Sequence, residues 1–425
     1  MMRKGKMNKR NIMRKSLALS ATVVLTFGIL LSAGGSAMTQ EASIAPDGNV
    51  PAAPPQPRGP ADPTELEAFL DELFAKQMAE YRIPGAAVSV VKDGRLFLAK
   101  GYGYADLEKR IPVDPEQTAF RIGSVGKLFT WTAVMQLVEQ GKLDLDADIN
   151  DYLDFRIPDT YPQPITLKHL LTHTAGFEDL WFEVLTWDAE DLMPVGEWLA
   201  SHMPARVRPP GDCAAYSNYG ANLAGYIVAR VSGQSYEQYI QENILDPLGM
   251  VHSTAESPAP PELRANASLG YWDVDGVVEA VPDYPEYLGQ AAMAPSGGHS
   301  SSIADMARFM IAHLQNGRYS DADIAEARIL AEGTVQQMHS TLYTADPRLL
   351  GNAYGFFEFS DNGQRTLGHT GDTLGFMTLL LLLPDQNLGV FVAYNKEGAG
   401  GLNTQHFGFQ TRLLQRNSGP WYLEN

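Results

Sequence analysis

Strand-like segments occur near both ends of this chain, and the stretch between them has helical patterns. Near the start, Ala86–Val91 and Leu96–Tyr104 flank an Asp-Gly pair, a strong signal for a β-hairpin. Strand-like runs return only late, at Arg365–Gly368, Phe376–Leu383 and Leu388–Tyr394. We therefore expect an α+β fold in which both chain ends build one antiparallel sheet flanked by helices, with a helical lobe inserted between them.

Helices are predicted before, between and after these strands. Apolar residues recur at three- and four-residue steps along Thr64–Arg82, which indicates an amphipathic helix that opens the folded domain. Further helices are expected at Ser124–Gln140, Leu167–Thr172, Val195–His202, Tyr219–Val231 and about Asn403–Arg416. The functional site should lie between the sheet and the helical lobe.

The first residues have the pattern of an export signal. Met1–Lys15 carries seven basic residues and no acidic one, and an apolar run, Leu17–Leu31, follows it. Small residues up to Ala37 suit a signal peptidase, so residues 1–37 are predicted to be a signal peptide. The apolar run also leaves open an uncleaved N-terminal anchor that would tether the protein to a membrane. We expect a periplasmic, secreted or outer-face location.

Composition divides the rest of the chain into a linker and one domain. Residues 38–63 are rich in proline and alanine without an apolar period and read as a disordered linker, and residues 64–425 as the folded domain. Without the seven basic residues of the export signal, the chain has 25 basic and 50 acidic residues. Such a surface repels phosphate backbones, so no nucleic-acid partner is expected.

A serine and a lysine three residues apart open the helix predicted at Ser124–Gln140. In Ser124-Val125-Gly126-Lys127 the two side chains share one helix face, so the amine can reach the hydroxyl. A serine hydroxyl is a weak nucleophile that needs an adjacent base, and a lysine held neutral can serve. Alone the pair is weak evidence, because such tetrads occur by chance and serine is a routine N-cap.

Two further short motifs follow along the chain. Tyr216-Ser217-Asn218 lies directly before a predicted helix, and His369-Thr370-Gly371 lies at the end of a predicted strand. Each also has a purely structural reading, as a half-buried tyrosine, an N-cap asparagine or a strand-ending turn. Their order after the Ser-x-x-Lys tetrad favours one shared site, because a tyrosine beside an ammonium group can shuttle a proton to a leaving group.

The three motifs, in this order on helix, loop and strand, resemble the active site of the serine β-lactamase and penicillin-binding-protein superfamily. The resemblance spans about residues 64–416 and includes Leu170–Phe177 and Pro295–Phe309. It implies an acyl-enzyme on Ser124, with Lys127 and Tyr216 sharing protons with it. It further implies that the Asn218 side chain binds the substrate amide and that His369, Thr370 and Gly371 form an edge strand along which the substrate lies. The backbone N–H groups of Ser124 and Asp372 would form the oxyanion hole.

His369 departs from the lysine often found at this position. A histidine with its ordinary pKa is mostly neutral at pH 7 and fixes a substrate carboxylate less well than lysine, which puts strong β-lactam hydrolysis in doubt. With no second carboxylate base identifiable for deacylation, the pattern is closer to class C β-lactamases, DD- or D-aminopeptidases and family VIII carboxylesterases.

The resulting functional expectation is a serine hydrolase for peptides or amides, including D-residue cell-wall peptides, or β-lactams. A carboxylesterase with the same site and a non-catalytic penicillin- or peptidoglycan-binding sensor stay open as alternatives. No cofactor is expected, and the sequence carries no signal for the oligomeric state.

Three other residues invite a functional reading that we do not adopt. His169 and His173 are four residues apart, as in a zinc-binding pair. However, no glutamate follows His169 to make the His-Glu-x-x-His motif, and no third ligand is evident. Cys213 is the only cysteine, cannot form an internal disulfide and is expected to be a packed residue beside the site.

Overall fold

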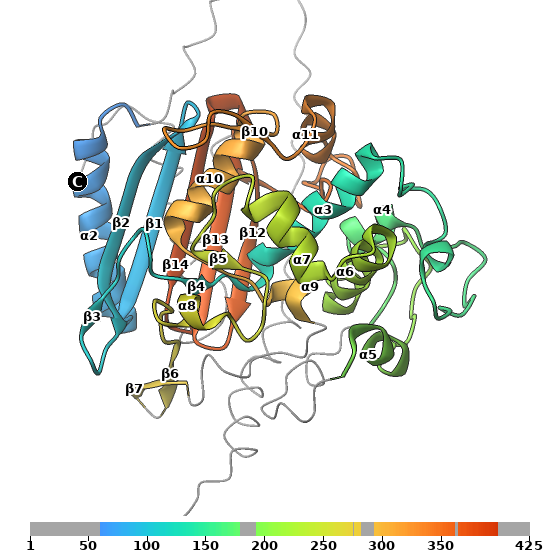
Figure 1. Ribbon diagram of the computed structural model, residues 1–425, viewed down its shortest axis with the longest axis horizontal. Coiled ribbons are helices and arrows are strands. Elements are labelled where there is room, and N and C mark those ends of the chain that lie inside the picture. The colour runs from blue at the N-terminus through green and yellow to red at the C-terminus, as the bar shows by residue number, and fades with distance from the viewer. Residues whose placement is uncertain (1–59, 179–192, 275, 282–292, 362–363, 398–425) are drawn as a thin grey trace, which may run out of the picture. The chain divides into compact units, whose positions relative to one another are not determined.

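A seven-stranded antiparallel sheet forms the centre of the fold (Figure 1). Its strand order is β11-β12-β13-β14-β1-β2-β3, so the first hairpin lies directly beside the last strand. Ala87 of β1 pairs with Ala393 of β14, which confirms that the two ends of the chain share one sheet. The strands of this sheet are β1 (Gly85–Lys92), β2 (Arg95–Asp106), β3 (Ile111–Pro112), β11 (Phe357–Asp361), β12 (Gln364–Thr373), β13 (Phe376–Leu383) and β14 (Leu388–Tyr394).

The computed structural model describes residues 60–178, 193–274, 276–281, 293–361 and 364–397. These belong to a single unit, Gly59–Glu397. The predicted export signal, residues 38–59 of the predicted linker and the helix expected at Asn403–Arg416 lie outside the described residues. The division of the chain into signal, linker and domain therefore stays a prediction.

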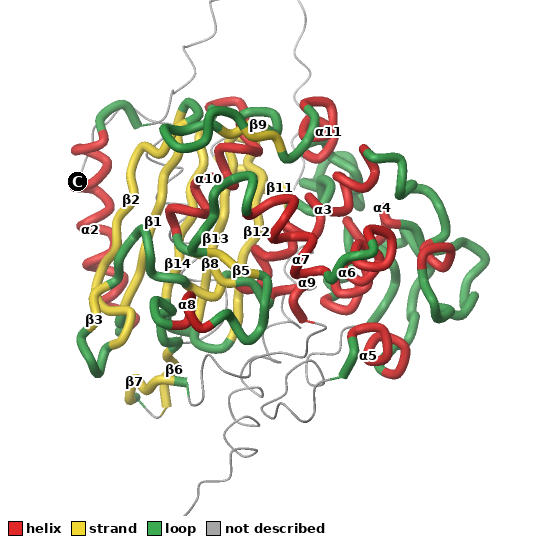
Figure 2. Tube along the Cα trace, in the orientation of Figure 1, coloured by secondary structure: helices red, strands yellow, loops and turns green. Residues whose placement is uncertain are grey.

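Helices flank the sheet and fill the segment between β3 and β11 (Figure 2). The helices are α2 (Pro63–Tyr81), α3 (Lys127–Glu139), α4 (Leu167–Leu171), α5 (Val195–Ser201), α6 (Asn218–Ser232), α7 (Tyr236–Ile240), α8 (Pro261–Arg264), α9 (Ala294–Gly297), α10 (Ile303–Leu314) and α11 (Glu332–Met338), with short 3-10 or π turns η1 (Gly123–Gly126), η2 (Ile149–Tyr152), η4 (Gln241–Leu245) and η6 (Pro384–Gln386). Short strands outside the main sheet are β4 (Phe120–Arg121), β5 (Ser253–Thr254), β6 (Tyr271–Val274), β7 (Val277–Ala280), β8 (Ser300–Ser301), β9 (Arg318–Tyr319) and β10 (Ala327–Arg328).

Opposite faces of the sheet are covered by α2 and α10. Tyr394 of β14 donates a hydrogen bond to Gln77 of α2, whereas Gly389 of the same strand faces Met310 of α10. Positions 389 and 394 are five residues apart, and side chains alternate along a strand, so the two helices lie on opposite faces. Every residue of β13 and β14 is buried, as expected for central strands covered on both sides.

The inserted helical lobe predicted from the sequence is confirmed (Figure 1). Helices α3, α6 and α9 pack on one another beside β12, and η1 packs against β12 and β13. Trp131, Leu223 and Ile227 are fully buried in this lobe, so its core is apolar. This packing brings the start of α3, the start of α6 and strand β12 to one place.

Individual elements differ from the expectation, and three of the differences bear on the site or the sheet. The helix predicted to start at Ser124 starts as an α-helix at Lys127, because Gly123–Gly126 forms a 3-10 turn. Strand β12 continues through His369-Thr370-Gly371 to Thr373, so this motif lies within a strand and not at its end. Strand β11 and helix α10 were not predicted, although Ser302 caps α10 by accepting a hydrogen bond from the backbone of Asp305.

Within the described residues, no helix has both the length and the apolar character needed to cross a membrane.

Candidate active site

Ser124 lies in the 3-10 turn that leads into α3. Its side chain is part-exposed, whereas Ile122, Gly123 and Val125 around it are buried. The turn therefore presents one hydroxyl at the rim of an otherwise packed segment, as a nucleophile that must meet substrate requires.

Gly123 brings the backbone before Ser124 against strand β12. It has a φ of +52°, and a Cβ atom placed on it would come within 2.8 Å of the backbone nitrogen of Asp372. Only glycine fits, since any side chain would be both strained and in collision. The backbone at Ser124 and at Asp372 is thereby held close together, as the predicted oxyanion hole requires. Sequence reasoning missed this role of Gly123.

Lys127 is the centre of the polar contacts at this place. Its side chain is fully buried, and Nζ donates hydrogen bonds to Ser124 Oγ at 2.9 Å and to Asn218 Oδ1 at 2.7 Å. A further bond, of 2.5 Å, runs to the backbone oxygen of Ser296. Three oxygen atoms match the three N–H donors of an ammonium group. A neutral amine also fits, by donating to Asn218 and Ser296 while accepting from the Ser124 hydroxyl.

Tyr216 and Asn218 come from the loop before α6 and from its first residue. The Nζ atom of Lys127 lies 4.7 Å from the centroid of the Tyr216 ring. The N-cap of α6 is Ser217, whose Oγ accepts a hydrogen bond from the backbone of Gly220. Asn218 therefore does not cap the helix, and its side-chain oxygen accepts from Lys127. The predicted catalytic residues Ser124, Lys127 and Tyr216 therefore lie together, although Ser124 and Tyr216 are 92 positions apart in the sequence.

His369-Thr370-Gly371 lies on β12 where the strand has an uncovered edge. Pairing with β11 ends at Gly368, and no other strand among the described residues pairs with the following positions on that side. Those positions therefore retain backbone groups able to pair with an extended ligand. Although β12 is not the edge strand of the whole sheet, its functional segment behaves as one.

The His369 ring is 1% exposed and uncharged. Burial, and secondarily the positive charge of Lys127, lowers the pKa of His369 to about 3. Nδ1 lies 2.6 Å from the backbone oxygen of Thr370, which can only accept, so Nδ1 carries the proton and Nε2 presents a lone pair. The ring centroid lies 6.1 Å from that of Tyr216. The ring is therefore an uncharged hydrogen-bond acceptor at neutral pH.

The side-chain carboxyl of Asp372 lies beside the predicted oxyanion hole and favours its neutral form. Burial, and to a lesser degree Glu397, raises the pKa of the Asp372 carboxyl well above its usual range, and burial raises the pKa of Glu397. A carboxyl that resists ionisation adds little negative charge beside the predicted oxyanion hole.

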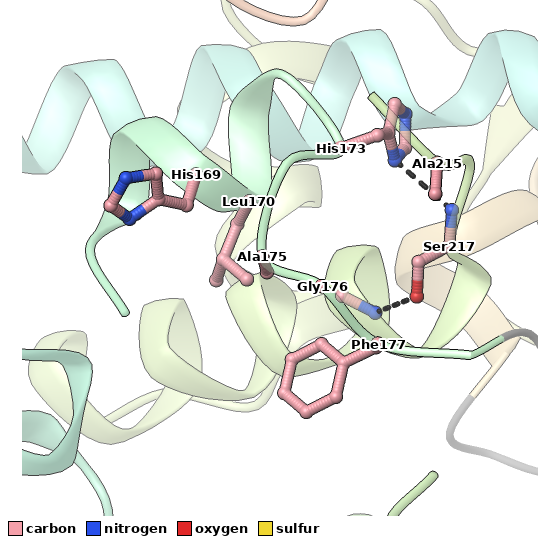
Figure 3. Close-up of a pocket in the computed structure, with 9 residues that line it drawn as sticks. His169, Leu170, His173, Ala175, Gly176, Phe177, Ala215 and Ser217 are labelled. Atoms are coloured by element: carbon pink, nitrogen blue, oxygen red, sulfur yellow. Dashed lines mark hydrogen bonds between the residues drawn. The ribbon is translucent and has the colours of Figure 1, made fainter. Parts of the chain in front are cut away.

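The two histidines that mimic a zinc pair have separate contacts, and their rings point apart (Figure 3). His169 Nδ1 accepts a hydrogen bond from the Thr166 backbone, and His173 Nδ1 accepts one from the Ser217 backbone. No cluster of three or more metal-ligating side chains occurs in the part of the chain that the structure describes. Cys213 is part-exposed and unpaired with another cysteine, close to Tyr343.

Comparisons with known proteins agree with this arrangement. A model of the Beta-lactamase family matches residues 70–411, and the chain belongs to this family. It is 28% identical over 331 residues to Protein flp of Staphylococcus aureus strain N315, covering 77% of this chain but only 62% of that protein. It is 28% identical over 348 residues to penicillin-binding protein 4 of Amycolatopsis lactamdurans, covering 80% of this chain and 87% of that protein.

Among solved structures, an octameric penicillin-binding protein homologue from Pyrococcus abyssi is similar, with a TM-score of 0.65 and 29% sequence identity. The match covers 80% of this chain and 74% of that one. The predicted fold class and the predicted resemblance to the β-lactamase and penicillin-binding-protein superfamily are both confirmed. The family consists of serine hydrolases and penicillin-binding proteins that act on β-lactam or peptide substrates.

Proposed function

We propose that this protein is an exported serine hydrolase that cleaves peptide or amide bonds through an acyl-enzyme on Ser124. Its substrates are peptides with D-residues, of the kind found in cell-wall stems. The observation that carries the proposal is the 2.9 Å hydrogen bond between Lys127 Nζ and Ser124 Oγ, with the Tyr216 ring 4.7 Å from the same nitrogen. A binding protein has no need of a serine hydroxyl bonded to a buried amine with a tyrosine ring beside it.

In the proposed acylation step, Ser124 Oγ attacks the substrate carbonyl carbon and loses its proton to the Lys127–Tyr216 pair. The negative charge that develops on the carbonyl oxygen is stabilised by the backbone N–H groups of Ser124 and Asp372. When the C–N bond breaks, the pair returns the proton to the departing amine. A water molecule then attacks the ester carbon and gives its proton to the same pair. When the bond between this carbon and Ser124 Oγ breaks, the pair returns the proton to Oγ, and the acid product leaves.

The uncovered stretch of β12 would hold the substrate backbone in this mechanism. An extended peptide beside His369-Thr370-Gly371 can pair with the free strand edge, which places its carbonyl near Ser124. The amide of Asn218, already an acceptor for Lys127, offers its N–H group to the substrate.

A carboxylesterase activity at the same site is the second candidate, and the state of His369 favours it. A neutral ring provides no positive charge to bind a substrate carboxylate. Uncharged esters have no carboxylate, so the absence of a cation at this position does not weaken their binding. For the same reason we expect substrates with a free carboxylate, β-lactams and D-alanyl-D-alanine peptides alike, to be turned over more slowly than they would be with a lysine at this position.

Location and partners belong to the proposal as well. The basic and apolar start of the chain supports export, by a cleaved signal or as an N-terminal tether to a membrane. Small peptide, ester or β-lactam molecules are the proposed ligands.

A substrate panel tests the proposal. Purified protein is assayed with D-alanyl-D-alanine peptides, nitrocefin and p-nitrophenyl esters, with Ser124→Ala as the matched control. Turnover of the D-peptides that vanishes in the control supports the peptidase. Turnover of esters alone would replace it by the esterase, and a reversible complex without turnover or adduct would leave a binding sensor.

A further inference from the structure

His173 holds the backbone on both sides of Tyr216. The backbone N–H of Ala215 donates to the His173 carbonyl oxygen at 2.7 Å, and the backbone N–H of Ser217 donates to His173 Nδ1 at 3.3 Å. Figure 3 shows His173 beside Ala215 and Ser217, with the second bond drawn. His173, 44 positions before Ser217, thus binds the backbone N–H of the residue on each side of the predicted proton-transfer tyrosine.

The ring of His173 also packs on the tyrosine itself. Its centroid lies 4.5 Å from that of Tyr216 and 6.3 Å from that of Trp131 in α3. The side chain is only 5% exposed, so this packing is not open to solvent. Both the backbone and the ring of Tyr216 therefore depend on the same neighbour.

The hydrogen bonding requires His173 to be neutral. An Nδ1 atom that accepts from a peptide N–H cannot carry a proton, so the remaining proton of the ring is on Nε2. Burial, and then the positive charge of Lys127, keeps the pKa of His173 well below its usual range. The acceptor is thus retained at neutral pH.

The backbone of His173 has a conformation that is uncommon for any residue other than glycine. Its φ is +56°, the left-handed region that asparagine and glycine adopt more easily. The turn is held by a hydrogen bond from the Asn352 side chain to the Thr172 carbonyl and by one from the Gly211 backbone to the Thr174 carbonyl. Strain that the surrounding contacts maintain is typical of residues with a role in a site.

We propose that His173 is a positioning residue that sets the place of Tyr216 relative to Lys127 and Ser124. The inference rests on the proposed hydrolase function and names a residue on which that function depends. Because a shift of about 1 Å in a reacting group can cost roughly 100-fold in rate, loss of this support should reduce turnover far more than substrate binding.

Three substitutions separate the contributions of His173. His173→Asn keeps a side-chain oxygen in reach of the Ser217 N–H and tolerates the left-handed backbone. His173→Phe keeps a ring against Tyr216 but has no acceptor. His173→Gly relieves the backbone strain, removes ring and acceptor, and replaces the phenylalanine variant if that one does not fold.

His169→Phe is the matched control. It also deletes a part-buried ring nitrogen that accepts a backbone hydrogen bond, here from Thr166, the N-cap of the short helix α4 that ends just before His173. It makes no contact with Tyr216, so it reports what the loss of one local hydrogen bond does to the fold alone.

The measurement is kcat and KM against pH for the substrate that the wild-type protein turns over. We expect His173→Phe or His173→Gly to lower kcat by about 10- to 100-fold with KM changed less than threefold, and to shift the limb of the pH profile that depends on Tyr216. His173→Asn should retain kcat within about fivefold, and His169→Phe within about twofold.

Three results would overturn the positioning role: a kcat for His173→Phe close to wild type, an equal loss in His173→Asn and His173→Phe, or an equal loss in the His169→Phe control. Failure of the proposed function is distinguishable, since the wild-type protein would then show no turnover and no adduct at Ser124.

Discussion

Lys127 Nζ donates a hydrogen bond to the backbone oxygen of Ser296, 169 residues further along the chain, at 2.5 Å. This contact joins the start of α3 to the short helix α9, and it leaves the amine directed at Ser124 and Asn218. The orientation of the proposed base therefore depends on a carbonyl group that belongs to the scaffold.

Replacement of Lys127 by methionine should abolish most of the activity without unfolding the protein. The two side chains are similar in length, but methionine can neither take the Ser124 proton nor satisfy the oxygens of Asn218 and Ser296. We expect turnover to fall by about 100- to 10,000-fold. Steady-state kinetics with circular dichroism on the same sample checks this, and a variant with half of the wild-type rate would contradict it.

A buried chain of hydrogen bonds holds the carbonyl group of Pro295, the residue directly before Ser296. Thr130 Oγ1 donates to the Pro295 carbonyl at 2.7 Å, so its oxygen must accept from Tyr236 OH, also at 2.7 Å. Tyr236 in turn accepts from His299 Nε2 at 2.9 Å. This direction agrees with His299 being neutral, since burial lowers the pKa of His299 to about 3.

Tyr236→Phe should destabilise the protein and disturb the site together. It leaves the Thr130 oxygen and the His299 nitrogen without their partner, at a cost of about 1–3 kcal/mol in the free energy of unfolding. Tyr219→Phe is the control, because the Tyr219 hydroxyl is also buried but donates to the Leu199 carbonyl, away from Lys127. Urea unfolding and kcat are measured for both, and equal effects on kcat would refute the link to Ser296.

Acid should destabilise the fold through histidines that are buried without charge. Burial lowers the pKa of His299 to about 3 and that of His313 well below its usual range. Between about pH 6.5 and 3 the unfolded chain binds protons that the folded one does not, so the free energy of unfolding falls as the pH falls, by about 1.4 kcal/mol per pH unit for each such histidine.

His313→Gln tests this dependence away from the site. His313 lies 3.3 Å from Thr132 through its Nε2 atom, and a glutamine amide can replace that contact without titrating. The variant should show a shallower decline of unfolding free energy between pH 6 and 5 than the wild type. Parallel curves would mean that His313 is not the source of the acid sensitivity.

His369→Lys should change substrate preference. An ammonium group at this position can form a charge-assisted hydrogen bond to a substrate carboxylate, worth about 1.5–3 kcal/mol. We expect the kcat/KM for nitrocefin relative to that for a p-nitrophenyl ester to rise by about tenfold or more, and thermal stability to fall because a second cation is buried near Lys127. His369→Gln, which stays neutral, is the control, and an unchanged ratio would contradict this role of charge.

Much of this arrangement was predictable because it depends on local patterns. The Asp-Gly hairpin and the apolar runs of β13 and β14 specify strands, and the three-residue spacing of Ser124 and Lys127 places their side chains on one face. Helix α10 also has a local signal, since Ser302 caps it and its apolar residues recur at helical spacing.

Other features have no signature in a single sequence. The Ser296 contact uses a backbone oxygen, which every residue possesses, so the sequence cannot mark it. The support of Tyr216 by His173 joins segments 44 positions apart through peptide groups, and it becomes visible only once the chain is folded. The uncovered edge of β12 likewise follows from where the pairing with β11 stops.

Covalent labelling of Ser124 tests the central claim most directly. The protein is treated with a fluorophosphonate, which carries no carboxylate, and is digested and sequenced by mass spectrometry, beside Ser124→Ala and Lys127→Met. The account predicts one adduct on Ser124 in the wild type, none in Ser124→Ala and slow labelling in Lys127→Met. Substrate turnover that persists in Ser124→Ala, or an adduct on another residue in place of Ser124, would contradict it.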